Sequence, residues 1–225
     1  LPGKPLIKIC GVPMLVRTFR LCLKCVPRNN ILVATDDYKI IELCNHEKIP
    51  SIITSKKCLT GTDRVAEVAK KIKRDIYINV QGDEPLLNTK DLKKLISYAK
   101  KYPNDIINGY CKIKNKENFF DPNIPKIVTG SNGKLLYMSR APIPNNKKNE
   151  FKKAWRQVCI YSLPYKALKS FSSIKKTELE NIEDLELLRF VELGYNIRMI
   201  SMSSKSISID NYKDIKIVEK ILKKN

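Results

Sequence analysis

Two aspartates follow short apolar runs, where parallel strands are expected to end. Asp83 comes directly after Gly82, shortly beyond the run 76–80, and Asp210 comes directly after residues 207–209. In open α/β sheets ligands bind beyond the carboxyl ends of the strands, and Mg²⁺ combines one or two carboxylates with water and phosphate oxygens. Asp83 and Asp210 are therefore candidate ligands of one magnesium ion, although each could instead only cap the helix that follows.

A glycine turn next to a lysine opens the sequence, in the segment Leu1-Pro2-Gly3-Lys4-Pro5-Leu6. The lysine ammonium is a compact charge that suits a phosphate group. A Gly-Lys pair is common by chance, so this segment gains meaning only together with the aspartates.

The elements that must position these residues follow from periodicity. Short β-branched runs alternate with longer amphipathic runs, which indicates an α/β sandwich of three layers with a mostly parallel central sheet. The expected strands are 31–34, 51–54, 76–80 and 197–201, and the expected helices are 38–48, one from 61, 89–101, 182–193 and 212–223. Within about 105–160 short runs are separated by Asn, Pro and Gly, which predicts a small antiparallel excursion or flap. We expect one domain over 1–225.

Composition limits the functional classes. The formal net charge is +20, but the lysines are spread along the chain without a nucleic-acid-binding motif, so we expect no nucleic-acid partner. No apolar run reaches the length of a membrane span, and residues 1–6 do not resemble a secretion signal, so we expect a cytoplasmic protein without a membrane partner.

Seven cysteines and a single histidine, His46, leave few options for a zinc site. Cys22 and Cys25 have the two-residue spacing of a zinc or redox pair, but no second pair completes four ligands. We expect reduced, packed thiols.

Several motifs in one order resemble the family of 3-deoxy-manno-octulosonate cytidylyltransferases, the CMP-Kdo synthetases, over nearly the whole chain. The most specific is Gln81-Gly82-Asp83-Glu84-Pro85. The others are the segment 1–6, Ala34-Thr35-Asp36, the run 61–68 that begins Gly61-Thr62-Asp63-Arg64, Asp121-Pro122-Asn123 with Lys126, Ser139-Arg140-Ala141, and Ile160-Tyr161.

The resemblance implies a Rossmann-like, GT-A-like nucleotidyltransferase fold, usually a homodimer, that joins CMP from CTP to an acidic octulosonate sugar. Asp83 and Asp210 would hold Mg²⁺, and Gly3, Lys4 and Asp83 would bind CTP, with Asp83, Lys4 and Asp210 forming the catalytic group. An arginine fork also matches the carboxylate of a sugar acid, although an arginine can equally form a surface ion pair. The implied sugar-acid ligands are Arg64, Gln81, Arg140, Tyr161, Gln157, Glu180 and Asn181.

The sequence departs from the family pattern in several places. The family has a further strand and a Pro-Ala-Arg loop before the segment that corresponds to 1–6. This sequence starts at that segment, so we expect either a fragment or a chain that lacks both. Gln157 and Asn181 stand where the family usually has histidine, Asn145 stands where it has an aromatic residue, and Ser204-Lys205-Ser206 replaces a glycine-containing segment. Two alternatives therefore stay open: a related acidic sugar, such as 8-amino-Kdo or a sialic acid, and a catalytically silent basic remnant with an acidic partner.

Overall fold

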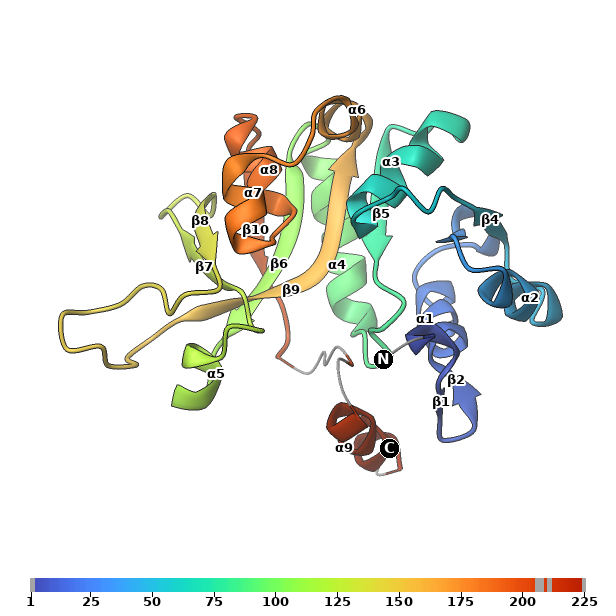
Figure 1. The fold of residues 1–225 in the computed structure, drawn as a ribbon, viewed down its shortest axis with the longest axis horizontal. Coiled ribbons are helices and arrows are strands. Elements are labelled where there is room, and N and C mark those ends of the chain that lie inside the picture. Colours follow the sequence, from blue (N-terminus) through green and yellow to red (C-terminus); the bar gives the residue numbers. More distant parts are fainter. Residues whose placement is uncertain (1–2, 205–208, 210–211, 224–225) are drawn as a thin grey trace. The chain divides into compact units, whose positions relative to one another are not determined.

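The computed structural model of the protein describes residues 3–204, 209 and 212–223 (Figure 1). The chain divides into two compact units. The first consists of Leu1–Arg64, Val80–Lys94 and Lys205–Asn225, and the second of Val65–Asn79 and Leu95–Ser204. The single domain expected over 1–225 stays a prediction.

The first unit contains a parallel strand pair between helices. Strands β3 (Val33–Thr35) and β4 (Ser51–Ile53) pair in parallel, and helix α2 (Tyr38–His46) connects them. Asp37 caps α2, because its carboxylate accepts a hydrogen bond from the backbone N–H of Lys39 at 2.8 Å. The remaining described elements are η1 (Lys4–Leu6), β1 (Lys8–Ile9), β2 (Val12–Pro13), α1 (Met14–Leu23), η2 (Arg28–Asn30) and α9 (Tyr212–Leu222).

Apolar side chains on one face of α1 pack against α2 and against Val33 of β3. Leu15, Val16 and Phe19 of α1 form a cluster with Ile40 and Cys44 of α2. Burial of such side chains is the main favourable term in folding. A second small cluster in this unit joins Ile9, Met14, Ile209 and Val218.

The second unit is built on a mixed six-stranded sheet. The strands β10 (Ile197–Ser201), β6 (Ile106–Lys112), β9 (Trp155–Pro164), β7 (Lys126–Thr129) and β8 (Leu135–Ser139) lie side by side in this order, and β5 (Ile76–Val80) also pairs with β9. β10 and β6 are parallel, whereas β6–β9, β7–β9 and β7–β8 are antiparallel. The antiparallel part expected within 105–160 is therefore present, and the long strand β9 forms its centre.

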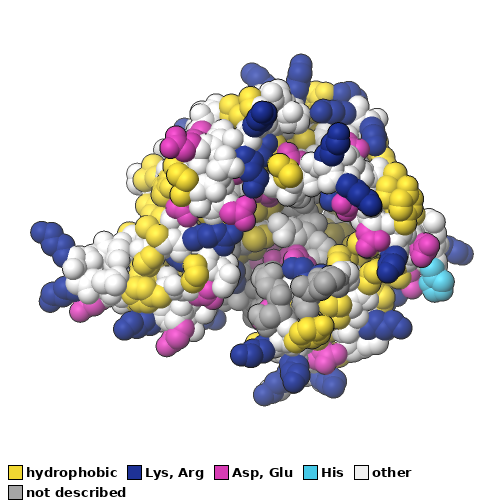
Figure 2. Space-filling model, viewed as in Figure 1, with side chains coloured by type: hydrophobic (Ala, Val, Ile, Leu, Met, Phe, Trp, Pro, Cys, Tyr) yellow, Lys and Arg dark blue, Asp and Glu magenta, His cyan; other side chains and the backbone are white. Residues whose placement is uncertain are grey.

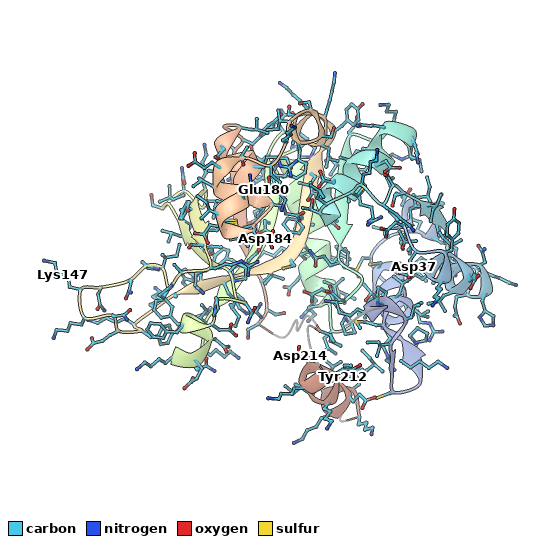
Figure 3. The ribbon with its side chains drawn as sticks, in the orientation of Figure 1. Asp37, Lys147, Glu180, Asp184, Tyr212 and Asp214 are labelled. Carbon is cyan, nitrogen blue, oxygen red and sulfur yellow. The ribbon has the colours of Figure 1, made fainter. Side chains whose placement is uncertain are left out.

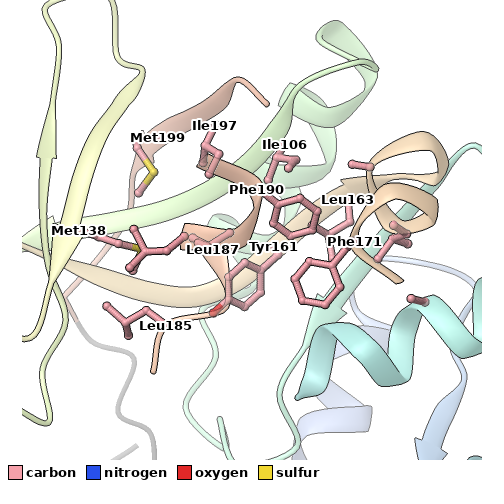
Figure 4. Packing of buried hydrophobic residues seen from close by; sticks show 14 of the residues in the cluster. Ile106, Met138, Tyr161, Leu163, Phe171, Leu185, Leu187, Phe190, Ile197 and Met199 are labelled. Carbon is pink, nitrogen blue, oxygen red and sulfur yellow. The ribbon is translucent and has the colours of Figure 1, made fainter. Parts of the chain in front are cut away.

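Three helices pack on this sheet, namely α6 (Tyr165–Ser173), α7 (Glu178–Glu183) and α8 (Leu187–Glu192). The short α5 (Lys116–Phe120) lies near β7 and β9 (Figure 1). Helices α3 (Gly61–Lys71) and α4 (Thr89–Lys101) contribute residues to both units. The main core includes Phe171, Leu187, Phe190 and Ile197, with the ring of Tyr161 beside Leu187 (Figure 4).

The α/β prediction is confirmed, and several predicted bounds agree with the structure. Strands 76–80 and 197–201 and helix 89–101 have the expected limits. The helix expected over 182–193 is instead two short helices, α7 and α8, because Asp184 adopts the left-handed conformation with φ of 50° and ends α7. Among the described helices, none is long and apolar enough to cross a membrane.

Candidate active site

An ion pair joins the lysine at the start of the chain to the aspartate beyond β5, both in the first unit. Lys4 Nζ donates to Asp83 Oδ2 at 2.6 Å, and the two side chains are 25% and 15% exposed. Gly3 has φ of 65°, a left-handed conformation that glycine adopts without strain, and it precedes the short helix that carries Lys4. Two residues predicted to bind CTP, Lys4 and Asp83, therefore lie in direct contact, and their roles stay predictions.

Two tight turns hold the loop after β5. The N–H of Glu84 donates to the carbonyl of Gln81 at 3.3 Å, and the N–H of Leu87 donates to that of Glu84 at 3.1 Å. Gly82 lies against α1, since a Cβ atom there would be 3.4 Å from Leu15 Cδ1. The loop that carries Asp83 is thus fixed by its own backbone and by helix packing.

The second carboxylate oxygen of Asp83 has a different environment from the first. Asp83 Oδ1 is buried and has no hydrogen-bond partner within the described part of the chain. A buried carboxylate oxygen without a partner is costly, and a cation is one group that would satisfy it. Asp83 therefore fits the role of a ligand for a hard divalent cation.

The second predicted metal ligand, Asp210, lies outside the described residues. The residue before it, Ile209, is fully buried, and its N–H donates to the carbonyl oxygen of Asp83 at 3.2 Å. Among the described residues, no group of three or more His, Cys, Asp or Glu side chains could hold a metal ion.

Arg64 stands in the first turn of α3, where a capping box fixes the helix start. The N–H of Thr60 donates to Asp63 Oδ2 at 3.0 Å, and the N–H of Asp63 donates to Thr60 Oγ1 at 3.1 Å. Arg64 donates through Nη1 to Thr54 Oγ1 at 2.5 Å and pairs through Nη2 with Asp36 Oδ1 at 3.1 Å. A substrate carboxylate at Arg64 would therefore compete with Asp36.

In the second unit, two of the predicted sugar ligands meet on β9. Gln157 Nε2 donates to the hydroxyl oxygen of Tyr161 at 3.1 Å, and also to Asn108 Oδ1 at 3.3 Å. Burial raises the pKa of Tyr161 well above its ordinary value, and the nearby Cys159 and Glu186 raise this pKa further. The Tyr161 phenol is therefore neutral and keeps its proton at any physiological pH.

Arg140 follows β8 and is held by backbone carbonyls. Its Nε donates to the carbonyl of Glu183 at 2.7 Å, its Nη1 to that of Pro122 at 3.0 Å and its Nη2 to that of Asp184 at 3.2 Å. Its own N–H donates to the Glu183 carboxylate at 2.8 Å. In this structure the hydrogen bonds of Arg140 therefore connect the end of β8 to the end of α7.

Lys126 lies under Arg140 and is completely buried. Its Nζ donates to the carbonyl of Asp121 at 2.9 Å and to that of Arg140. Burial lowers the pKa of Lys126, while the nearby Asp121 acts in the opposite direction. The part of the family motif that contains Lys126 thus supports the backbone of Arg140.

Glu180 and Asn181 on α7 point to different surroundings. Glu180, labelled in Figure 3, is 1% exposed. Arg189 of α8, 2% exposed, donates to both of its carboxylate oxygens at 2.5 and 2.7 Å. Arg189 also stacks on the ring of Phe171, 3.6 Å from the centroid. Asn181 is exposed, and its Nδ2 donates to the carbonyl of Lys176 at 3.3 Å.

The structure thus brings together Lys4 with Asp83, and Gln157 with Tyr161. Sequence reasoning missed Asn108, which binds Gln157, and Glu183, which accepts hydrogen bonds from Ser139 Oγ at 2.5 Å and from the Arg140 N–H. A polar residue in an otherwise apolar strand such as 106–111 was the available signal for Asn108.

Comparisons with known proteins identify the family of this chain. A family model described as "Cytidylyltransferase" matches residues 1–205. A 3-deoxy-manno-octulosonate cytidylyltransferase of Acidobacterium capsulatum is 33% identical over 223 residues, which cover 99% of this chain and 91% of the relative.

Solved structures with a similar fold include a member of the same family and a more distant nucleotidyltransferase. A CMP:2-keto-3-deoxy-manno-octonic acid synthetase, solved in complex with CTP, superposes with a TM-score of 0.92 at 30% identity and covers 100% of this chain and 93% of its own. A putative glucose-1-phosphate thymidylyltransferase of Bacillus anthracis has a TM-score of 0.71 at 11% identity, over 97% of this chain and 86% of its own, and shares the fold alone.

Proposed function

The chain belongs to the family of 3-deoxy-manno-octulosonate cytidylyltransferases, and from this premise we propose that it transfers CMP from CTP to 3-deoxy-manno-octulosonate (Kdo). The product is CMP-Kdo, a precursor for lipopolysaccharide biosynthesis. The observation that carries the proposal at the site is the pair of Lys4 and Asp83 beyond the carboxyl end of β5, joined at 2.6 Å.

In the proposed reaction, the anomeric hydroxyl of the sugar attacks the α-phosphorus of CTP. The new bond joins the anomeric oxygen to the α-phosphorus, the bond from this phosphorus to the oxygen that bridges to the β-phosphate breaks, pyrophosphate leaves, and the hydroxyl proton is released to solvent. Such a transfer needs positioning and charge neutralisation rather than a nucleophilic side chain. Lys4 would contact the phosphates as a point charge, and the Gly3 turn presents it.

We propose Mg²⁺ as the divalent cation, held by Asp83 and Asp210. The buried Asp83 Oδ1 without a partner in the described chain supports the first ligand, and the hydrogen bond from Ile209, the neighbour of Asp210, to the Asp83 carbonyl supports the second. When bound, the cation neutralises charge on the phosphate oxygens.

For the sugar acid we propose Arg64, Gln81, Arg140, Gln157, Tyr161 and Asn181 as ligands. Arg64 and Arg140 carry the planar forks that match a carboxylate. We give Glu180 a supporting role instead, because Arg189 occupies both of its carboxylate oxygens.

Pyrophosphate release from CTP and Mg²⁺ tests the proposal, with Kdo, 8-amino-Kdo and a sialic acid offered separately. Release with Kdo alone is the expected result. Release only with 8-amino-Kdo or only with a sialic acid would keep the reaction and change the substrate. No release with any of them, from protein shown to be folded by circular dichroism, would contradict the transferase.

We further propose a homodimeric protein of the cytoplasm. All seven cysteines lack a disulfide, as expected in a reducing compartment. The segment between β8 and β9 extends away from these strands (Figure 1), and Leu136 of β8 is 60% exposed, which makes this region the proposed contact. Sedimentation of the wild type and of a Leu136→Lys variant tests this contact, since the variant should sediment as a monomer.

A further inference from the structure

The pairing of β6 with β9 contains an irregularity next to the proposed sugar ligands. Asn108 lies opposite Tyr161, but the next residue, Gly109, lies opposite Val158. Two residues of β9, Cys159 and Ile160, therefore have no partner on β6. Bulges of this kind bend a strand locally and often redirect a side chain.

The side chain of Asn108 donates to two backbone carbonyls at this bulge, one of them in its unpaired segment. Asn108 is completely buried, and its Nδ2 donates to the carbonyl of Val158 at 3.0 Å and to that of Ile160 at 2.8 Å. Both amide hydrogens are thus used within the bulge. Without them, two buried carbonyl groups would lose a hydrogen bond, at a cost of about 1–3 kcal/mol for each unsatisfied group.

The bulge brings together two side chains that a regular strand would separate. Residues four apart in an extended strand lie roughly 13 Å from each other. In β9, Gln157 Nε2 nevertheless lies 3.1 Å from the hydroxyl of Tyr161. A second anchor fixes this geometry, because Gln157 Nε2 also donates to Asn108 Oδ1 at 3.3 Å.

The same two bonds determine which way the Gln157 amide faces. Both hydrogens of Nε2 are engaged, one by Asn108 and one by Tyr161, so the amide nitrogen is directed at these partners and Oε1 faces away from them. The Tyr161 oxygen accepts one of these hydrogens, and its O–H can donate to a further acceptor, with Cys159 within hydrogen-bonding reach.

We infer that Asn108 is a positioning residue for sugar binding, which acts through Gln157 and Tyr161 by holding the β9 bulge and the orientation of the Gln157 amide. Gln157 Oε1 then offers an acceptor and the Tyr161 hydroxyl a donor, a pair that suits a sugar hydroxyl. This inference rests on the proposed function and adds to it a residue that does not touch the substrate.

The kinetic test compares Asn108→Ala, Gln157→Ala and the double variant by pyrophosphate release. Each single variant should raise the KM for Kdo roughly tenfold, which corresponds to about 1.4 kcal/mol, and leave the KM for CTP unchanged. Because Asn108 acts in part through Gln157, the double variant should raise this KM by less than the product of the two single effects. Additive effects, or an equal rise in the KM for CTP, would overturn the inference.

Ser162→Ala is a matched control, because Ser162 is also buried on β9 and lies opposite Ile107 of β6. Its KM for Kdo should stay within a factor of two of the wild type. Should Asn108→Ala fail to fold, Asn108→Ser replaces it, since a hydroxyl keeps one donor for the bulge and should give a smaller rise in the same KM.

A readout without turnover separates this inference from the proposed function. In the wild type the side-chain NH₂ signals of Gln157 in a ¹⁵N-correlated spectrum should exchange slowly with water, and in Asn108→Ala they should exchange quickly. Unchanged exchange would overturn the positioning role, whether or not the wild type releases pyrophosphate. An inactive wild type with the expected exchange would contradict the proposed function alone.

Discussion

At the scale of single residues, the two oxygens of Asp83 have separate roles. Oδ2 accepts the hydrogen bond from Lys4, whereas Oδ1 is buried without a partner in the described chain. An aspartate that only capped a helix would direct an oxygen to backbone N–H groups. The observed arrangement favours the proposed role of Asp83 as a cation ligand beside Lys4.

Asp83→Asn should reduce kcat for pyrophosphate release by at least about 100-fold, because the loss of one charged group at a phosphoryl-transfer centre is worth several kcal/mol. The midpoint of thermal unfolding should change little, since the amide fills the same space. Asp37→Asn is the control: Asp37 caps α2 and an asparagine caps equally well, so activity and stability should be retained. Full activity in Asp83→Asn would remove the cation assignment.

A second residue-scale prediction concerns Cys22 and alkaline pH. Burial raises the pKa of the Cys22 thiol from 9.0 to about 12. Between these values the unfolded thiol ionises and the folded thiol does not, so the folded state loses stability as the pH rises. The loss attributable to Cys22 should be about 2 kcal/mol between pH 8 and pH 10.5.

Urea unfolding of the wild type and of Cys22→Ala at these two pH values measures this loss. The variant starts from a lower free energy of unfolding because a buried side chain is shortened, but it should lose less on going to pH 10.5. An identical loss in both proteins would mean that other groups cause the alkaline destabilisation.

At the scale of elements, the α7–α8 pair shows what periodicity can and cannot predict. The apolar residues over 182–193 recur at helical spacing, and helices form there. The break at Asp184 depends on tertiary contacts that periodicity does not contain: Arg140 binds the carbonyls of Glu183 and Asp184, which end α7. One periodic run therefore became two short helices.

The candidate site also has parts that local sequence predicts and parts that depend on tertiary contacts. The loop with Asp83 and the capped start of α3 could be predicted, because they depend on local sequence and on the end of a strand. The pairing of Gln157 with Tyr161 could not, because it depends on a bulge that Asn108, distant in sequence, stabilises. The burial of Glu180 was also missed, since its partner Arg189 lies on a different helix from the one that carries it.

Glu180→Gln should therefore act on stability rather than on sugar binding. Removal of one charge from a buried ion pair leaves Arg189 without its counter-charge, which costs about 3–5 kcal/mol. Chemical denaturation should show this loss, while the KM for Kdo of the protein that remains folded should stay close to that of the wild type. A normal stability with a large rise in the KM would instead support the sugar-ligand role that the family resemblance implies for Glu180.

At the scale of the whole molecule, the charge of +20 does not form one separate positive face in the view of Figure 2, where lysines and arginines are interspersed with acids and apolar groups. In the proposed function the positive charge that contacts the substrates is instead local, at Lys4, Arg64 and Arg140. Binding of CTP should accordingly depend on Lys4 and Asp83 and should be a property of the folded protein as a whole.

CTP with Mg²⁺ should raise the midpoint of thermal unfolding, because a ligand that binds only the folded state stabilises it by RT ln(1 + L/Kd), where L is the free ligand concentration. At a concentration 100 times its Kd, CTP should add about 2.7 kcal/mol, or about 5–10 °C for a chain of this size. Differential scanning calorimetry measures this shift.

Three comparisons serve as controls. UTP, which differs in the base, should protect less than CTP. The Lys4→Ala and Asp83→Asn variants should lose most of the shift in the unfolding midpoint, whereas Lys147→Ala, in the exposed segment between β8 and β9, should keep it. Protection by single-stranded RNA but not by CTP, abolished by salt, would instead identify the chain as a basic remnant of the fold.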